Sequence, residues 1–144
     1  MLKLEQANRI IGASFARARA LYLAPIVVAV VDAGGHLIAY QREDGAGIAR
    51  FNIAFGKAWG SLGMGFGSRE LSERSVKSPT FVSALSVVTG GRMIPSPGGV
   101  LVGNAAGHII GAVGISGDIG DRDEECAVAG IEAIGLKAFP GKVI

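Results

Sequence analysis

The chain has 144 residues, of which 49% are hydrophobic and 18% are charged, and its formal net charge is +2. This length suits one domain whose core needs neither disulfides nor a metal, so we expect a single domain over residues 1–144. The fourteen basic residues are spread along the chain and form no run interleaved with aromatic residues, which argues against a nucleic-acid-binding protein.

Membrane and secretory signals are also missing from the sequence. The longest apolar stretch, residues 21–31, is too short to span a bilayer and contains Pro25. The N-terminal residues form no apolar secretory region, and Cys126 is the only cysteine. We therefore expect a cytoplasmic protein with no membrane partner and no intrachain disulfide.

The high apolar content predicts an assembly. A small protein has a large surface, and an apolar fraction of 49% indicates that some of this surface is buried between subunits. The expected partner is a second copy of the chain, in a homo-oligomer. The alternative is that the many alanine and glycine residues raise the apolar fraction without any interface.

The predicted elements begin with a helix and a hairpin. Apolar residues recur every three or four positions over 4–21, which predicts an amphipathic helix that ends before Pro25. Residues 27–39 predict one strand, a glycine turn and a second strand. The first of these strands is apolar without alternation, so both of its faces should be covered by other parts of the chain.

The middle of the chain is predicted to be helical. One helix is expected over residues 47–62, although its glycines weaken its end. Another is expected over residues 68–76, with Ser68 as its N-terminal cap. Residues 81–88 fit either a helix or a strand.

The last third returns to strands and closes with a helix. Strands are expected over residues 92–94, 100–102 and 109–115. A helix should begin at Asp121, with Glu124 completing a capping box. Because adjacent strands are joined by tight turns, the fold class is α/β of the α+β type, an antiparallel sheet of about five strands flanked by helices.

Charged residues at the ends of the buried elements form the first candidate site. Arg42 and Asp44 follow the second strand, and Lys57 lies on an otherwise apolar helix, where it either holds an anionic ligand or forms an internal salt bridge. Asp32 closes the first strand, where it either caps the turn or acts as a base. The candidate catalytic residues are therefore Lys57, Asp32 and Asp44, and the candidate ligand-binding residues include Arg42, Asp44 and Lys57.

A second candidate lies before the last helix. Gly114 and Ser116 belong to a glycine-rich stretch that leads into the helix, a pattern typical of an anion site at a helix N-terminus. The acidic residues over 118–124 disfavour phosphate and are better suited to cap the helix. We keep Gly114 and Ser116 as ligand-binding candidates.

Metal ligands are few. His36 and His108, the only histidines, both lie where a turn meets a strand, and each is either an exposed side chain or a ligand to a metal or haem iron. No third nitrogen or sulfur ligand lies nearby in the sequence, which argues against an ordinary zinc site. Glu70 and Glu73, three apart on a predicted helix, would either share a cation at the surface or belong to a solvated face.

Three stretches together resemble the GlcG/HbpS family, which includes the C-terminal domain of PduO-type proteins. They are Val30–Ala46, which contains Val-Val-Asp-Ala-Gly-Gly-His and Arg-Glu-Asp-Gly-Ala, then Ala54–Trp59, and Ile110–Ala127. The resemblance covers nearly the whole chain. It implies a profilin-like fold, symmetric oligomers from dimers to octamers, and haem or a related tetrapyrrole as the ligand.

The resemblance also indicates which residues to consider for iron. Glu70 and Glu73 resemble the surface Glu-x-x-Glu iron site of the haem-binding branch. Haem-binding relatives can use a histidine of the N-terminal helix, whereas residues 4–21 of this chain contain none. The side chains left as axial-ligand candidates are Tyr40, Met64, Met93, His36 and His108.

Three functions remain open from the sequence. The first is a binding protein for haem or a related tetrapyrrole. The second is a small lyase or isomerase on a carboxylated metabolite, in which Lys57 and Arg42 hold the carboxylate and Asp32 or Asp44 is the base. The third is an oligomeric accessory protein without catalysis.

Overall fold

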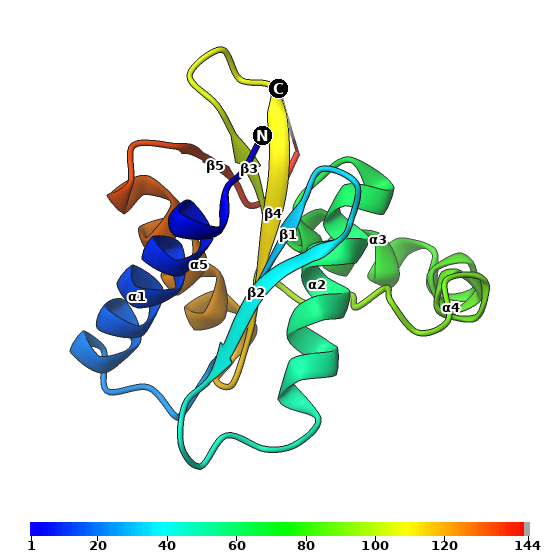
Figure 1. Ribbon diagram of the computed structural model, residues 1–144. Helices are drawn as coiled ribbons and strands as arrows, with labels where there is room; N and C mark the ends of the chain where they lie inside the picture. The colour runs from blue at the N-terminus through cyan, green and yellow to red at the C-terminus, as the bar shows by residue number, and fades with distance from the viewer. Residues whose placement is uncertain (143–144) are drawn as a thin grey trace.

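Five strands form one antiparallel sheet with helices on both of its faces in the computed structural model, which describes residues 1–142 (Figure 1). The strand order is β2-β1-β4-β3-β5, and every neighbouring pair runs antiparallel. The predicted antiparallel sheet of about five strands is confirmed. The strands are β1 (Val27–Asp32), β2 (Leu37–Arg42), β3 (Gly99–Gly103), β4 (Ile109–Ser116) and β5 (Lys137–Phe139).

Two helices cover one face of the sheet and a third covers the other. In Figure 1, α1 and α5 lie on one side of the sheet and α2 lies on the opposite side, with α3 and α4 extending beyond α2. The helices are α1 (Leu4–Ala20), α2 (Arg50–Met64), α3 (Ser68–Lys77), α4 (Pro79–Val88) and α5 (Gly120–Ala133).

The position of β1 between β2 and β4 shows why its sequence lacks alternation. Val28 and Val30 pack with α1 and α5, whereas Val27, Ala29 and Val31 pack toward α2. The first five residues of β1 are buried, as predicted for a strand covered on both faces.

The structure of residues 89–98 differs from the predicted strand order. No strand forms at 92–94; this stretch is a loop, and the fifth strand is instead β5, which pairs with β3. Pro95 and Pro97 lack the N–H groups that a sheet requires, and the Met93 side chain is buried in a cluster with Phe66 and Leu71. The ambiguous stretch 81–88 lies in helix α4.

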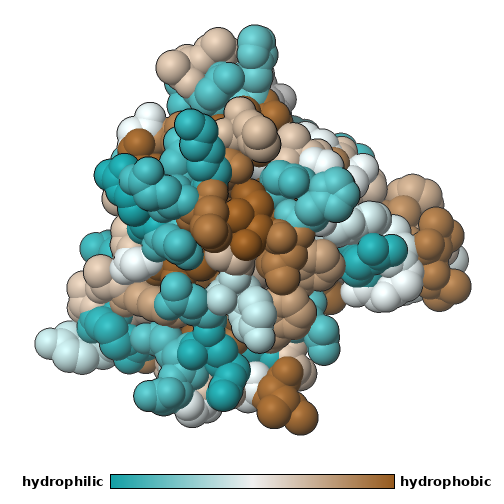
Figure 2. Space-filling view, viewed as in Figure 1, coloured by the Kyte–Doolittle hydropathy of each residue, from teal (hydrophilic) through white to brown (hydrophobic). Residues whose placement is uncertain are grey.

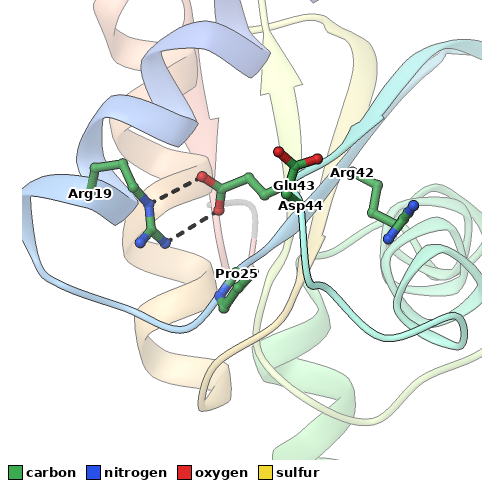
Figure 3. A pocket seen from close by; sticks show the side chains of 5 residues that line it. All are labelled: Arg19, Pro25, Arg42, Glu43 and Asp44. Carbon is green, nitrogen blue, oxygen red and sulfur yellow. Dashed lines mark hydrogen bonds and ion pairs between the residues drawn. The ribbon is translucent and has the colours of Figure 1, made fainter.

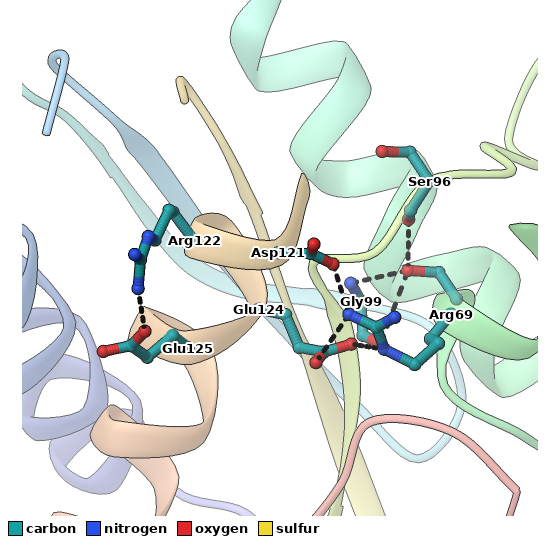
Figure 4. Close-up of polar contacts among 8 residues, drawn as sticks. Arg69, Ser96, Gly99, Asp121, Arg122, Glu124 and Glu125 are labelled. Atoms are coloured by element: carbon teal, nitrogen blue, oxygen red, sulfur yellow. Dashed lines mark hydrogen bonds and ion pairs between the residues drawn. The ribbon is translucent and has the colours of Figure 1, made fainter. Parts of the chain in front are cut away.

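The predicted helix caps are wrong because tertiary contacts recruit the side chains. Helix α5 begins at Gly120 after Ile119, without a side-chain cap, and Asp121 instead pairs with Arg69 of α3 (Figure 4). Ser68 is the first residue of α3. Its hydroxyl donates to the carbonyl of Ser96 at 2.6 Å and accepts from the N–H of Gly99 at 2.7 Å.

Exposed apolar side chains gather over β2 and on α4, while others stand elsewhere on the surface (Figure 2). Phe81, Val87 and Val88 of α4 are exposed, and Leu37 of β2 is exposed as well. Such surface is compatible with the expected homo-oligomer, which stays a prediction. Among residues 1–142, no helix has both the length and the apolar character needed to cross a bilayer.

The close approach of α2 to the sheet gives the first prediction. A Cβ added to Gly114 of β4 would lie 1.8 Å from the carbonyl oxygen of Ala54 in α2, so Gly114→Ala must push the helix away. We expect it to lower the free energy of unfolding by about 1–3 kcal/mol or more. Urea unfolding measures this change.

Gly12→Ala is the matched control, because nothing lies within 4 Å of the added Cβ and the residue is in helix α1. This variant should be stabilised by about 0.5–1 kcal/mol. Equal unfolding midpoints for the two variants would contradict the tight contact at Gly114.

Candidate functional site

The charged residues of the predicted site lie at opposite ends of β1. Arg42 pairs across the sheet with Val27, at the start of β1, whereas Asp32 is the last residue of β1. At about 3.3 Å per residue, these ends are roughly 17 Å apart. Asp32 and Arg42 therefore do not share one site.

Lys57 is an internal residue of the structure. Its side chain is 3% exposed, and Nζ donates to the carbonyl oxygen of Ile115 at 2.9 Å and to Asp123 Oδ2 at 3.2 Å. The predicted internal salt bridge is present, but its acid is Asp123 of α5 rather than Asp32 or Asp44. Burial lowers the pKa of Lys57 and raises the pKa of Asp123, while the attraction between the two charges opposes both shifts.

The sequence did not predict Asp123 as the partner of Lys57, because Asp123 is one of several neighbouring acidic residues. It lies in the first turn of α5 among other acidic residues, all of which were interpreted as caps. Its Oδ1 accepts the N–H of Asp118 at 3.0 Å, so its carboxylate holds the turn before α5 as well as Lys57. Asp123 lies on the side of α5 that faces Lys57 of α2. This placement depends on how the two helices pack, so it cannot be read from the local sequence.

Gly114 and Ser116 are both buried. Gly114 lies directly under the backbone of Ala54, and the hydroxyl of Ser116 accepts a hydrogen bond from Arg50 Nη1 at 3.1 Å. The structure therefore places these two candidates in the packing between β4 and α2.

A shallow pocket of about 450 Å³ lies at the end of β2 (Figure 3). One wall is closed by an ion pair: Arg19 Nε lies 3.1 Å from Glu43 Oε2, and Arg19 also donates to two backbone carbonyls. The side chain of Arg42 extends away from this pair and donates to the carbonyl of Ala46 at 3.1 Å. Asp44 lines the same pocket, and within residues 1–142 neither Asp44 nor Arg42 forms an ion pair.

A smaller hollow of about 180 Å³ lies at the other end of the sheet, between the β1–β2 turn and α2. Its lining is Ala33, Gly34, Gly35, Trp59, Leu62 and Gly63. The guanidinium of Arg92 stacks 4.4 Å from the centre of the Trp59 ring. Glycines at this turn leave backbone, rather than side chains, as much of the wall of the hollow.

His36 and Asp32 lie beside this hollow and form a hydrogen-bonded pair. Asp32 Oδ1 accepts the N–H groups of Gly34 at 2.9 Å and of His36 at 3.0 Å, and it lies 3.2 Å from His36 Nδ1. These contacts, led by the bond from the His36 N–H, lower the pKa of Asp32. Asp32 therefore holds the turn and contacts an imidazole, while its role as a base stays a prediction.

The other metal candidates differ in their surroundings. His108 is exposed at the β3–β4 turn, where its N–H donates to Asn104 Oδ1 at 2.9 Å. Glu70 accepts from Arg74 at 3.0 Å, which lowers the pKa of Glu70, and Glu73 is exposed on the same helix. Over residues 1–142, no group of three or more histidine, cysteine, aspartate or glutamate side chains is placed to hold a metal ion.

The structure also separates the axial-ligand candidates. Met93 is 2% exposed in the core, and Met64 is packed against the same cluster. The Tyr40 ring lies 4.4 Å from the Phe51 ring. The candidates whose side chains are exposed are Tyr40, His36 and His108.

Comparison with known proteins now gives the family. A family model described as haem degrading protein HbpS-like matches residues 2–132. This chain belongs to the HbpS-like family.

Solved structures of similar proteins share the fold of this HbpS-like chain. The crystal structure of a PduOC–haem complex matches with a TM-score of 0.83 and 27% identity, covering 96% of each chain. The crystal structure of HbpS matches with a TM-score of 0.79 and 28% identity, over 93% of this chain and 90% of that one. The 15.0 kDa protein in the dhaT–dhaS intergenic region of Citrobacter freundii is 30% identical over 108 residues, 75% of each chain.

The buried ion pair gives the second prediction. Lys57→Met leaves the Asp123 carboxylate buried without its partner and should cost about 3–5 kcal/mol of unfolding free energy. The double variant Lys57→Met/Asp123→Leu removes both charges and should recover most of that loss. Denaturant unfolding of the single and double variants measures the coupling.

Arg122→Ala is a matched control, because Arg122 pairs with Glu125 at the surface, at 2.8 Å. Its cost should stay below about 1 kcal/mol. The assignment fails if the losses of Lys57→Met and Asp123→Leu simply add in the double variant.

Proposed function

We propose that this HbpS-like chain binds haem or a related tetrapyrrole at the hollow between the β1–β2 turn and α2. The observation that carries the proposal is the lining of this hollow, which combines the Trp59 indole with the glycines Gly34, Gly35 and Gly63. A planar ring can approach a glycine backbone closely and stack against an aromatic side chain. The hollow is small, so it would take one edge of a macrocycle.

Charge at the rim suits a tetrapyrrole with acidic substituents. Arg92, stacked on Trp59, is exposed and its Nε donates to the carbonyl of Thr89 at 2.9 Å. Its remaining donors would pair with a carboxylate at the edge of the ring. Further support comes from the similar PduOC protein, which was solved as a haem complex.

Hemin titration tests this function. Adding hemin to the apoprotein should shift and sharpen its Soret band in a saturable manner. Trp59→Ala should weaken binding by about tenfold, equivalent to about 1.4 kcal/mol, because the stacking surface is lost.

Tyr22→Ala is the control, since Tyr22 is an aromatic residue that is 93% exposed and does not line the hollow. Its hemin affinity should equal that of the wild type. A Soret band of hemin that does not change with added wild-type protein rules the proposal out.

A second function, the binding or conversion of a small carboxylated metabolite, is favoured by the pocket at the end of β2. Arg42 and Asp44 carry opposite charges, line one pocket and form no ion pair within residues 1–142. A carboxylate on Arg42 and a hydroxyl or amino group on Asp44 would satisfy both side chains. Lys57 does not take part in this version of the site, because Asp123 and the carbonyl of Ile115 hold its ammonium group.

A metabolite screen with Arg42→Ala tests this second function. A hydroxy- or amino-carboxylate that binds the wild type should lose at least tenfold in affinity, since the charged hydrogen bond is worth about 1.5–3 kcal/mol. Isothermal titration measures the loss. Arg9→Ala, at an exposed position of α1, should leave the affinity unchanged. Equal binding by Arg42→Ala and the wild type would place the ligand elsewhere.

A further inference from the structure

We infer that two copies of this chain pair through the outward face of α4, in an antiparallel helix contact centred on Ala84. The outward face is the side of α4 that carries Phe81, Ala84, Val87 and Val88. This inference goes beyond the proposed functions and depends on neither ligand, because α4 lines neither the hollow nor the pocket at the end of β2.

Helix α4 has two apolar sides, and the chain itself covers only one of them. Val82, the one buried residue among the ten of this helix, packs with Leu85 against the cluster that contains Met93. None of the ten residues is charged. A surface helix normally carries charged or polar residues opposite its buried side, whereas the side of α4 away from Val82 is mainly apolar.

The outward face is exposed in the single chain. Phe81 is 58% exposed, Val87 is 83% exposed and Val88 is 81% exposed, and Ala84 between them is exposed as well. Their spacing of three and four residues places them on one side of the helix, as in a helix that packs against a core. Figure 2 shows this apolar surface on α4, which extends beyond α2 in Figure 1.

The size of this surface fits one half of a dimer interface. The outward face, together with the exposed Val76 three residues before α4, offers roughly 300–400 Å² of apolar area. One side of a standard interface buries about 800 Å², of which a little over half, about 450 Å², is apolar. The arm formed by α3 and α4 therefore supplies most of the apolar area that a stable pair requires.

The order of the side chains makes the outward face complementary to itself. A two-fold axis at Ala84 places Phe81 of each copy against the partner subunit's Val87, and the two small alanines face each other at the centre. Small side chains at the contact let two helices approach closely, and a two-fold interface uses the same patch on both subunits. A membrane is a poorer partner, because helices that lie on lipid carry lysine or arginine on their polar side and α4 has neither.

Analytical ultracentrifugation of the wild type and two lysine variants tests this pairing. The wild type should sediment as a dimer or a larger even-numbered assembly, and Val87→Lys should halve its mass. Lysine is a good helix former and is favourable near a helix C-terminus, so circular dichroism of this variant should be unchanged. Ile48→Lys is the matched control, because Ile48 is 95% exposed and lies outside α4, and it should keep the wild-type mass.

A disulfide crosslink tests the position of the axis, independently of any loss of stability in Val87→Lys. Under mild oxidation, Ala84→Cys should form a covalent dimer, because the two-fold axis brings the two copies of this position together. The native Cys126 is buried and should not compete. Ala105→Cys, at an exposed position of the β3–β4 turn, should stay unlinked at the same concentration.

Three results would overturn the inference. A wild type that sediments as a monomer up to its solubility limit forms no such pair. A Val87→Lys variant that keeps the wild-type mass places the interface elsewhere, as does equal crosslinking of Ala84→Cys and Ala105→Cys. A monomeric wild type that binds phosphatidylcholine vesicles, and loses this binding in Val87→Lys, would assign the outward face to a membrane instead.

Discussion

The buried ion pair between Lys57 and Asp123 holds together the elements packed around the end of β4. It joins α2 on one face of the sheet to α5 on the other, and Lys57 also donates to the carbonyl of Ile115 in β4. Either charge left alone at this depth would cost several kcal/mol. The two helices are therefore fixed relative to one another by a polar contact as well as by apolar packing, and Asp123 extends that constraint to the turn before α5.

Glycines make this contact geometrically possible. A Cβ on Gly98 would lie 2.8 Å from Lys57 Nζ, and a Cβ on Gly99 would lie 2.2 Å from the carbonyl oxygen of Lys57. Side chains at these positions would push α2 away from the sheet and take the lysine out of reach of its acid. The glycine-rich loop before β3 thus supports the ion pair. This accounts for a lysine that looks reactive in the sequence but serves as part of the scaffold.

Local patterns predicted four of the five strands, but they placed a strand at 92–94, where the structure has a loop, and missed β5. They failed where tertiary contacts decide. The unbroken apolar run of β1 and the tight turns gave an antiparallel sheet covered on both faces, as observed. Ser68 and Asp121 are good caps by residue type, yet the structure uses both in contacts between distant elements. In the candidate site, the sequence identified His36 and Asp32 separately. The short spacing that joins them was visible, but the packing of Trp59 beside their turn was not.

The two proposed functions are placed at opposite ends of β1. Haem binding is proposed at the β1–β2 turn, whereas the pocket of Arg42 and Asp44 lies where β2 ends. The six residues of β1 keep these regions roughly 17 Å apart. Substitutions that far apart and without shared partners have nearly additive effects. A loss of binding caused by a change at one end therefore identifies that end as the site, because the rigid strand between them gives no reason for the other end to respond.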